Sequence, residues 1–142
     1  MYNLTLEQAR ELARDYNIIP LVTEIYGDMD TPISVFKRMA SEKECFLLES
    51  IGNSLVTARY SFIGRNPFIT FSGTGERIEI KYSGGRSESF KGKPMEELEK
   101  LINKFRAPKL DDIPSFNGGA VGLFSYDIIR QYEDLPNVNE DD

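Results

Sequence analysis

The residue types that most often carry out catalysis are scarce in this 142-residue chain. It contains no histidine and a single cysteine, Cys45. Serine and cysteine nucleophiles that depend on a histidine base are therefore excluded within the chain, as are zinc sites with histidine ligands. The chemistry that remains is that of carboxylates, lysines, tyrosines and serines. A single cysteine cannot form an internal disulfide, which is typical of proteins kept in a reducing compartment.

A carboxylate and a hydroxyl end an apolar stretch at residues 46–50, which read Phe-Leu-Leu-Glu-Ser. The stretch predicts a strand, and period two places Ser50 on the face of Phe46 and Leu48, with Glu49 on the other face. One polar side chain at this end therefore points where apolar side chains point, and it needs a partner. The alternative is a strand that runs into a turn, with Glu49 solvated and Ser50 beginning the turn.

A second polar stretch, residues 59–64, reads Arg-Tyr-Ser-Phe-Ile-Gly. Alternation places Arg59 and Ser61 on one face and Tyr60 on the other. If this strand lies beside the first, polar groups of both can converge on a site for a free amino acid. Such a zwitterion needs an acceptor for its ammonium group, donors for its carboxylate and an apolar slot for its side chain. The alternative is a cross-strand ion pair of Glu49 and Arg59 on an exposed sheet face.

Two other patterns that could bind a phosphate or a metal lack the required spacing. The glycine-rich segment 118–122 has no Gly-Lys-Ser/Thr ending and does not fit Gly-x-Gly-x-x-Gly, so we expect no nucleotide site. Asp111 and Asp112, like Asp141 and Asp142, are adjacent instead of three or four residues apart on a helix. We therefore predict no metal site and no cofactor in this chain.

The elements that must position these residues alternate between helical and strand periodicity. Capping residues or prolines followed by apolar residues three or four apart predict helices over residues 5–16, from 31 to near 43, and from 94 to before Pro108. Period-two stretches bounded by glycine, asparagine and serine predict an antiparallel meander over residues 45–49, 57–63, 67–71, 76–82 and 86–90. The predicted class is α+β, an antiparallel β-sheet with flanking helices.

Two more segments are predicted to be extended. β-branched residues at 18–26 favour a strand, which Pro20 restricts to a sheet edge or a bulge. The apolar, glycine-dense segment 116–127 favours a late buried strand, followed by a helix from residue 128. We also expect this segment to present an exposed apolar face and the chain to self-associate.

The net charge of −6 is unevenly distributed along the chain. Five acids and no base occur from Glu133 onward, which leaves 18 acids and 17 bases before it. Without a basic stripe we expect no nucleic-acid binding. No stretch approaches the roughly 18–20 apolar residues that cross a bilayer, and the polar, acidic start is unlike a signal peptide. We therefore expect a cytoplasmic protein that does not bind membranes.

Several short motifs follow one another in a distinctive order. They are Pro-Leu-Val-Thr-Glu at 20–24, Asp-Thr-Pro at 30–32, Phe-Leu-Leu-Glu-Ser at 46–50, Arg-Tyr-Ser-Phe-Ile-Gly at 59–64 before Pro67, and Gly-Gly-Ala-Val-Gly at 118–122 before Tyr126-Asp127 and Leu135-Pro136. In this order the chain resembles the amino-terminal region of anthranilate synthase component I. The resemblance implies a regulatory domain over residues 1–136, an acidic linker at 137–142, and an incomplete part of a larger fold.

The resemblance also implies a function. The complete protein would convert chorismate and ammonia into anthranilate and pyruvate, in tryptophan biosynthesis. A glutamine amidotransferase, component II, would deliver the ammonia, and a larger carboxy-terminal catalytic domain would bind chorismate and magnesium. This fragment would be non-catalytic and would hold part of the site for the feedback inhibitor tryptophan. Ser50 matches the best-known inhibitor contact of the family, with Glu49 beside it, and Arg59, Tyr60 and Ser61 match the flanking strand.

Two alternatives remain open. The amino-terminal region of aminodeoxychorismate synthase component I, from the folate pathway, is similar and also belongs to an enzyme that uses chorismate. The other alternative is a stand-alone α+β binding domain with no enzyme attached. The intact Leu-Leu-Glu-Ser and Arg-Tyr-Ser-Phe-Ile-Gly motifs favour the anthranilate enzyme.

Overall fold

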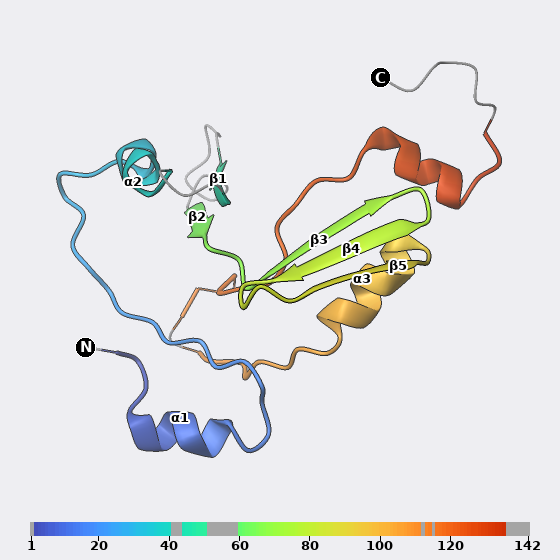
Figure 1. Cartoon of the computed structure of the whole chain (residues 1–142). Helices are drawn as coiled ribbons and strands as arrows, with labels where there is room; N and C mark the ends of the chain where they lie inside the picture. The colour runs from blue at the N-terminus through green and yellow to red at the C-terminus, as the bar shows by residue number, and fades with distance from the viewer. Residues whose placement is uncertain (1, 41–43, 51–59, 112, 115, 136–142) are drawn as a thin grey trace. The chain divides into compact units, whose positions relative to one another are not determined.

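The computed structural model of the chain describes residues 2–40, 44–50, 60–111, 113–114 and 116–135 (Figure 1). Its contacts divide the chain into two compact units. The first unit is Thr23–Lys91, and the second joins Tyr2–Val22 to Gly92–Asp142. The described elements include α-helices and antiparallel strands, so the predicted α+β class is confirmed. The proposed domain and linker limits stay predictions, and residues 137–142 lie outside the described residues.

The strands of the first unit form two sheets instead of one meander. β1 (Cys45–Glu49) pairs with β2 (Ser61–Arg65) in a two-stranded antiparallel ribbon. β3 (Ile69–Thr74), β4 (Arg77–Tyr82) and β5 (Ser87–Lys91) form a three-stranded antiparallel sheet in that order. Each of these strands overlaps a predicted one, although residues 57–59 of the second predicted strand lie outside the described residues.

The break between the two sheets falls at Asn66 and Pro67. The amide of Asn66 still donates to the carbonyl of Glu44, at 3.1 Å, which continues the ribbon by one step. Asn66 then adopts a φ of 53°, a left-handed conformation that asparagine tolerates and a strand does not use. Pro67 has no amide hydrogen to donate. β2 and β3, on either side of this point, do not pair with each other, which the sequence periodicity alone did not reveal.

The three-stranded sheet has one dry and one wet face, as the alternation in β4 predicts. Ile78 and Ile80 are 0% and 4% exposed. Arg77 and Lys81, on the opposite face, are exposed. Among the described residues, the buried hydrophobic side chains are Ile78, Ile80 and Leu101. The described part of the chain therefore has a very small apolar core.

Helix α2 (Pro32–Met39) contacts both strands of the ribbon (Figure 1). It begins with a capping box, in which the hydroxyl of Thr31 accepts from the amide of Ser34 and the hydroxyl of Ser34 accepts from the amide of Thr31. Pro32 fits the first helical turn, where its missing amide hydrogen costs nothing. The sequence thus predicts the start of α2 correctly. Residues 41–43, near its predicted end, lie outside the described residues.

The second unit contains the remaining helices. α1 (Leu6–Leu12) begins with the predicted capping box of Thr5 and Gln8. α3 (Pro94–Ile102) begins at the predicted proline. Both end earlier than their apolar spacing suggests, because that spacing continues into turns that are not α-helical. The helix predicted from residue 128 is a short 3₁₀-helix, η1 (Tyr126–Gln131).

The strand predicted at 18–26 is wrong, because the segment makes isolated hydrogen bonds and no ladder with a neighbouring strand. The side chain of Asn17 donates to the carbonyl of Lys104 and accepts from the amide of Arg106, both at 2.7 Å. The side chain of Asn3 accepts from the amide of Val22 at 2.8 Å. The backbone adds single bonds from the amide of Asn3 to the carbonyl of Val22 and from the amide of Ile18 to the carbonyl of Arg106, and no strand is formed at 18–26.

The late strand predicted at 116–127 is also wrong for the described residues. Gly119 has a φ of 136°, which is not a strand conformation. The apolar side chains that follow are exposed, with Leu123 at 92% and Tyr126 at 86%. Apolar side chains of this segment are thus exposed, although not on a strand, and self-association stays a prediction.

The ribbon contains a close contact that fixes its register. Gly64 lies opposite Phe46, and a Cβ atom added to Gly64 would lie 2.5 Å from Cζ of the Phe46 ring. The ring therefore occupies the space that any other residue at 64 would need.

We predict that Gly64→Ala destabilises the chain by about 1–3 kcal/mol, the usual cost of overpacking. Urea unfolding of the 142-residue chain measures this. Gly84→Ala is the matched control, because a Cβ there meets nothing within 4 Å. The double variant Gly64→Ala with Phe46→Ala should cost less than the two single costs combined. Equal stability of the Gly64→Ala and Gly84→Ala variants would contradict the close contact.

An ionic clamp ties the turn before α2 to its last turn. The carboxylate of Asp30 accepts from both terminal nitrogens of Arg38, from Nη1 at 3.3 Å, and from the hydroxyl of Ser34 at 3.2 Å. The hydrogen bond from Arg38 lowers the pKa of Asp30 below its ordinary value. Because this pKa is lowered on folding, the stabilisation is present above the ordinary value and is lost as the pH falls through the lowered one.

We predict that Arg38→Gln raises the pKa of Asp30 back towards about 3.9, the ordinary value of an aspartate. A carboxyl-carbon NMR titration of the chain follows this group directly. Arg10→Gln removes an exposed arginine with no ion pair to a described residue and serves as the control. An unchanged pKa in the Arg38 variant would show that the clamp does not persist in solution.

Candidate functional site

The end of the β1–β2 ribbon brings together most of the residues that the sequence singles out. The register places Glu49 directly opposite Ser61 and Leu48 opposite Phe62. The predicted pairing of the two polar stretches is therefore confirmed. Ser50 directly follows β1, and Tyr60 directly precedes β2. Arg59 lies outside the described residues, so its convergence with Glu49 stays a prediction.

Two faces of the ribbon carry different chemistry. Glu49 and Ser61 share one face, because residues directly opposite in an antiparallel pair point the same way. Leu48 and Phe62 share the other face. The ring of Tyr60 lies beside that of Phe62, with centroids 6.1 Å apart and planes tilted by 33°. One face thus ends in a carboxylate and a hydroxyl, and the other in an aliphatic and aromatic surface.

The polar groups at the ribbon end are accessible. Glu49, Ser50 and Ser61 are exposed, and Leu48 and Tyr60 are about half exposed. Glu49 makes no ion pair with another described residue. Both sets of side chains belong to the same ribbon end, and the residues 51–59 that join the two strands lie outside the described residues. The carboxylate can accept from an ammonium group while the apolar face receives a side chain.

Metal chemistry finds no support in the described part of the chain. No three histidine, cysteine, aspartate or glutamate residues there lie close enough to hold a metal ion. The magnesium that the resemblance implies for the complete enzyme stays a prediction. Of the described helices, none has the length and apolar character needed to cross a membrane.

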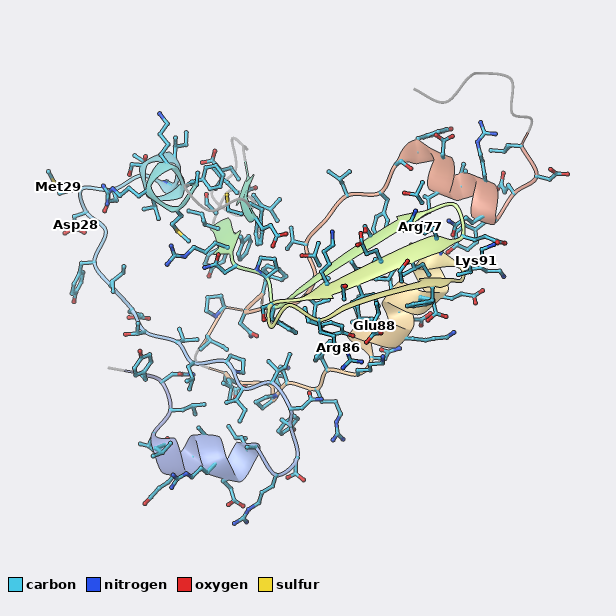
Figure 2. The ribbon with its side chains drawn as sticks, viewed as in Figure 1. Asp28, Met29, Arg77, Arg86, Glu88 and Lys91 are labelled. Atoms are coloured by element: carbon cyan, nitrogen blue, oxygen red, sulfur yellow. The ribbon has the colours of Figure 1, made fainter. Side chains whose placement is uncertain are left out.

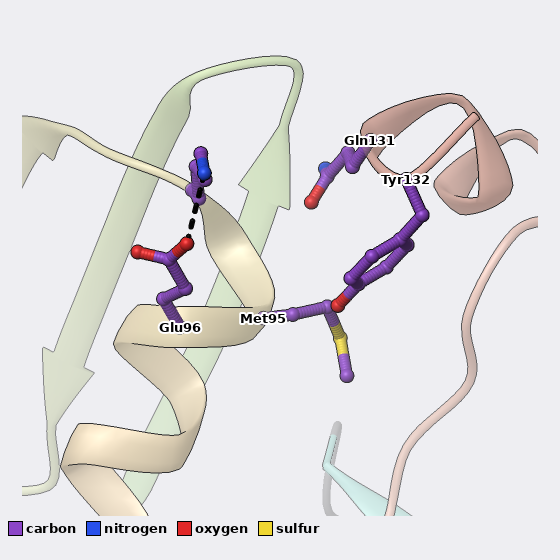
Figure 3. Close-up of a pocket in the computed structure, with 5 residues that line it drawn as sticks. Met95, Glu96, Gln131 and Tyr132 are labelled. Atoms are coloured by element: carbon purple, nitrogen blue, oxygen red, sulfur yellow. Dashed lines mark hydrogen bonds and ion pairs between the residues drawn. The ribbon is translucent and has the colours of Figure 1, made fainter. Parts of the chain in front are cut away.

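A shallow pocket of about 270 Å³ lies in the second unit, between the start of α3 and η1 (Figure 3). Its lining residues are Lys93, Met95, Glu96, Gln131 and Tyr132. The Lys93 ammonium and the Glu96 carboxylate are paired at 3.0 Å, which raises the pKa of Lys93. Sequence reasoning did not single out these residues, which belong to no motif. Because its two charges satisfy each other, the pocket is a weaker candidate than the ribbon end.

Three relatives of the chain, from different bacteria, carry the same name. The chain is similar to anthranilate synthase component 1 of Acetivibrio thermocellus, with 46% identity over 142 residues, which are all of this chain and 29% of that protein. The protein of the same name from Aquifex aeolicus is 37% identical over 144 residues, covering 98% of this chain and 28% of the relative. The protein of the same name from Neisseria meningitidis serogroup B is 35% identical over 127 residues, which cover 89% of this chain and 26% of that relative.

The chain thus spans just over a quarter of the length of these relatives, at their amino-terminal end. No family model matches the chain, and no solved structure matches it. The similarity extends over the ribbon and the segments on both sides of it. The chain therefore belongs to the anthranilate synthase component 1 family, of which it is an amino-terminal region.

Proposed function

We propose that this chain is the tryptophan-sensing portion of an anthranilate synthase component I. The complete enzyme converts chorismate and ammonia into anthranilate and pyruvate, with ammonia from a glutamine amidotransferase and magnesium bound in its carboxy-terminal domain. The chain itself performs no catalysis. The proposal rests on relatives that carry this name, and it places the complete protein in the cytoplasm.

The observation that carries the proposal is the register of the ribbon. Pairing Glu49 with Ser61 and Leu48 with Phe62 puts a carboxylate, hydroxyls and an aromatic surface within one small tip. A free tryptophan has an ammonium group, a carboxylate and a large indole ring. Glu49 accepts from the ammonium, Ser50 and Ser61 supply hydroxyl donors, and Arg59 adds a cation for the carboxylate. The indole packs on the surface of Leu48, Tyr60 and Phe62.

An exposed tip of this kind is only part of a pocket. Small-molecule sites usually bury 70–90% of their ligand, whereas Glu49, Ser50 and Ser61 are exposed. The remaining walls come from the part of the protein that the relatives possess beyond the region of similarity. Tryptophan then bridges the two parts and binds the inactive arrangement more tightly than the active one. Inhibition requires only this difference in affinity between two states.

We predict that Ser50→Ala in the complete enzyme raises the tryptophan concentration for half inhibition by roughly tenfold, as for the loss of one hydrogen bond to a charged group. Ser50→Phe should raise it further, because the ring fills the site. Turnover without tryptophan should stay close to that of the unaltered enzyme, since the reacting groups lie outside this chain. Inhibition curves for anthranilate formation measure both quantities.

Ser83→Ala and Ser83→Phe are matched controls, because Ser83 is an exposed serine in the hairpin between β4 and β5. They should leave inhibition unchanged. Full sensitivity to tryptophan in both Ser50 variants would refute the assignment of Ser50. The same assay identifies the product, and aminodeoxychorismate in place of anthranilate would favour the folate enzyme instead.

A further inference from the structure

The wet face of the three-stranded sheet has an unusual composition. Period two and the register assign nine residues to this surface, which we call the polar face. Each of these side chains carries a hydroxyl group or a charge. They are Thr70, Ser72 and Thr74 on β3, Arg77, Glu79 and Lys81 on β4, and Ser87, Ser89 and Lys91 on β5. Three cations and one anion give this face a charge of about +2 in a chain of net charge −6.

Two of the cations lie directly opposite each other. The register pairs Arg77 of β4 with Lys91 of β5, and Figure 2 shows both at the same end of the sheet. Side chains in such pairs have Cβ atoms about 4.5–5.5 Å apart, and like charges there are unfavourable. Thr74 lies opposite Arg77 on the other side, so a hydroxyl completes the cluster.

In the part of the chain that the structure describes, no counter-charge relieves this repulsion. The side chains of Arg77 and Lys91 form no hydrogen bond or ion pair with any described residue. The single acid of the polar face, Glu79, is paired with Lys81 at 3.3 Å. The arrangement is therefore a ready site for carboxylates, because a guanidinium binds them in a fork and an ammonium adds a point charge.

The polar face differs from the other exposed surfaces of the chain. Side chains such as Ile25, Met29 and Leu123 are apolar and almost fully exposed, as expected where further protein of the same chain covers them permanently. The polar face offers no apolar area for such burial. Charged, hydroxyl-rich surfaces suit contacts between separate subunits that meet in water, where complementary charge raises the association rate and selects the partner.

We propose that the polar face is a docking surface for the second component of the enzyme, which binds through carboxylates seated on Arg77 and Lys91. The name component 1, which the relatives carry, implies such a partner. This inference rests on the proposed function. The face measures roughly 20 by 14 Å, about a third of the roughly 800 Å² that each partner buries in a standard interface. It therefore forms one part of a larger contact.

The test uses the complete component 1 protein and its separately purified second component. Arg77→Gln with Lys91→Gln should weaken their association at least tenfold at low salt, and the remaining affinity should depend less on salt concentration. Glutamine-dependent anthranilate formation should fall when the second component is limiting. Formation from free ammonia should not change, because Arg77 and Lys91 do not contact the reactants. Sedimentation or calorimetric titration gives the affinities.

The matched control is Arg10→Gln with Lys37→Gln, which removes the same charge from two exposed residues of α1 and α2. It should leave the affinity within a factor of about two. Charge reversal, Arg77→Glu with Lys91→Glu, should weaken association more than neutralisation does. Unchanged affinity in both sheet variants would overturn the docking surface while leaving the proposed function intact. A complete protein that forms no anthranilate from ammonia would instead overturn the proposed function.

Discussion

The pairing of β1 with β2 is the constraint on which the site depends. Side chains alternate along a strand, so a slip of one residue would exchange the faces of Glu49 and Leu48. The ring of Phe46 over Gly64 opposes such a slip, because no other residue of β2 lacks a Cβ to accommodate it. Helix α2 contacts both strands and adds a second restraint. The chemistry of the ribbon end is therefore set by packing three residues away from it.

Whether a feature of the fold could be predicted from the sequence depends on how far apart in sequence its interacting residues lie. Capping boxes and first-turn prolines act within four residues, so the starts of all three α-helices could be predicted from Thr5, Thr31 and Pro94. The five strands and the pairing of the two polar stretches could be predicted from alternation and turn residues. These signals are local, and they agree with the final structure because nothing distant opposes them.

The features that could not be predicted depend on partners far away in sequence. The segment 18–26 has strand composition, but Asn17 bonds to the backbone near residue 105 and Asn3 bonds to Val22. Nothing in the periodicity indicates that these bonds stay isolated instead of forming a ladder. The segment 116–127 has the composition of a buried strand, yet composition cannot supply the neighbour that buries it. The predicted single meander is wrong at one step, because β2 and β3 do not pair, and nothing in the periodicity indicates this.

The separation of the ribbon from the three-stranded sheet suits the two roles proposed for them. A two-stranded ribbon is marginally stable alone, because it has few apolar contacts and two unpaired edges. Elements that respond to ligands come from this low-stability end of a protein, and a sensor must have two arrangements of similar energy for tryptophan to choose between. The three-stranded sheet has the buried pair Ile78 and Ile80 and an ordered ladder on both sides of β4. A docking surface needs that rigidity, since flexible cations would lose entropy on binding and weaken the contact. Asn66 and Pro67 lie in the short connection between the two sheets, so one chain carries both.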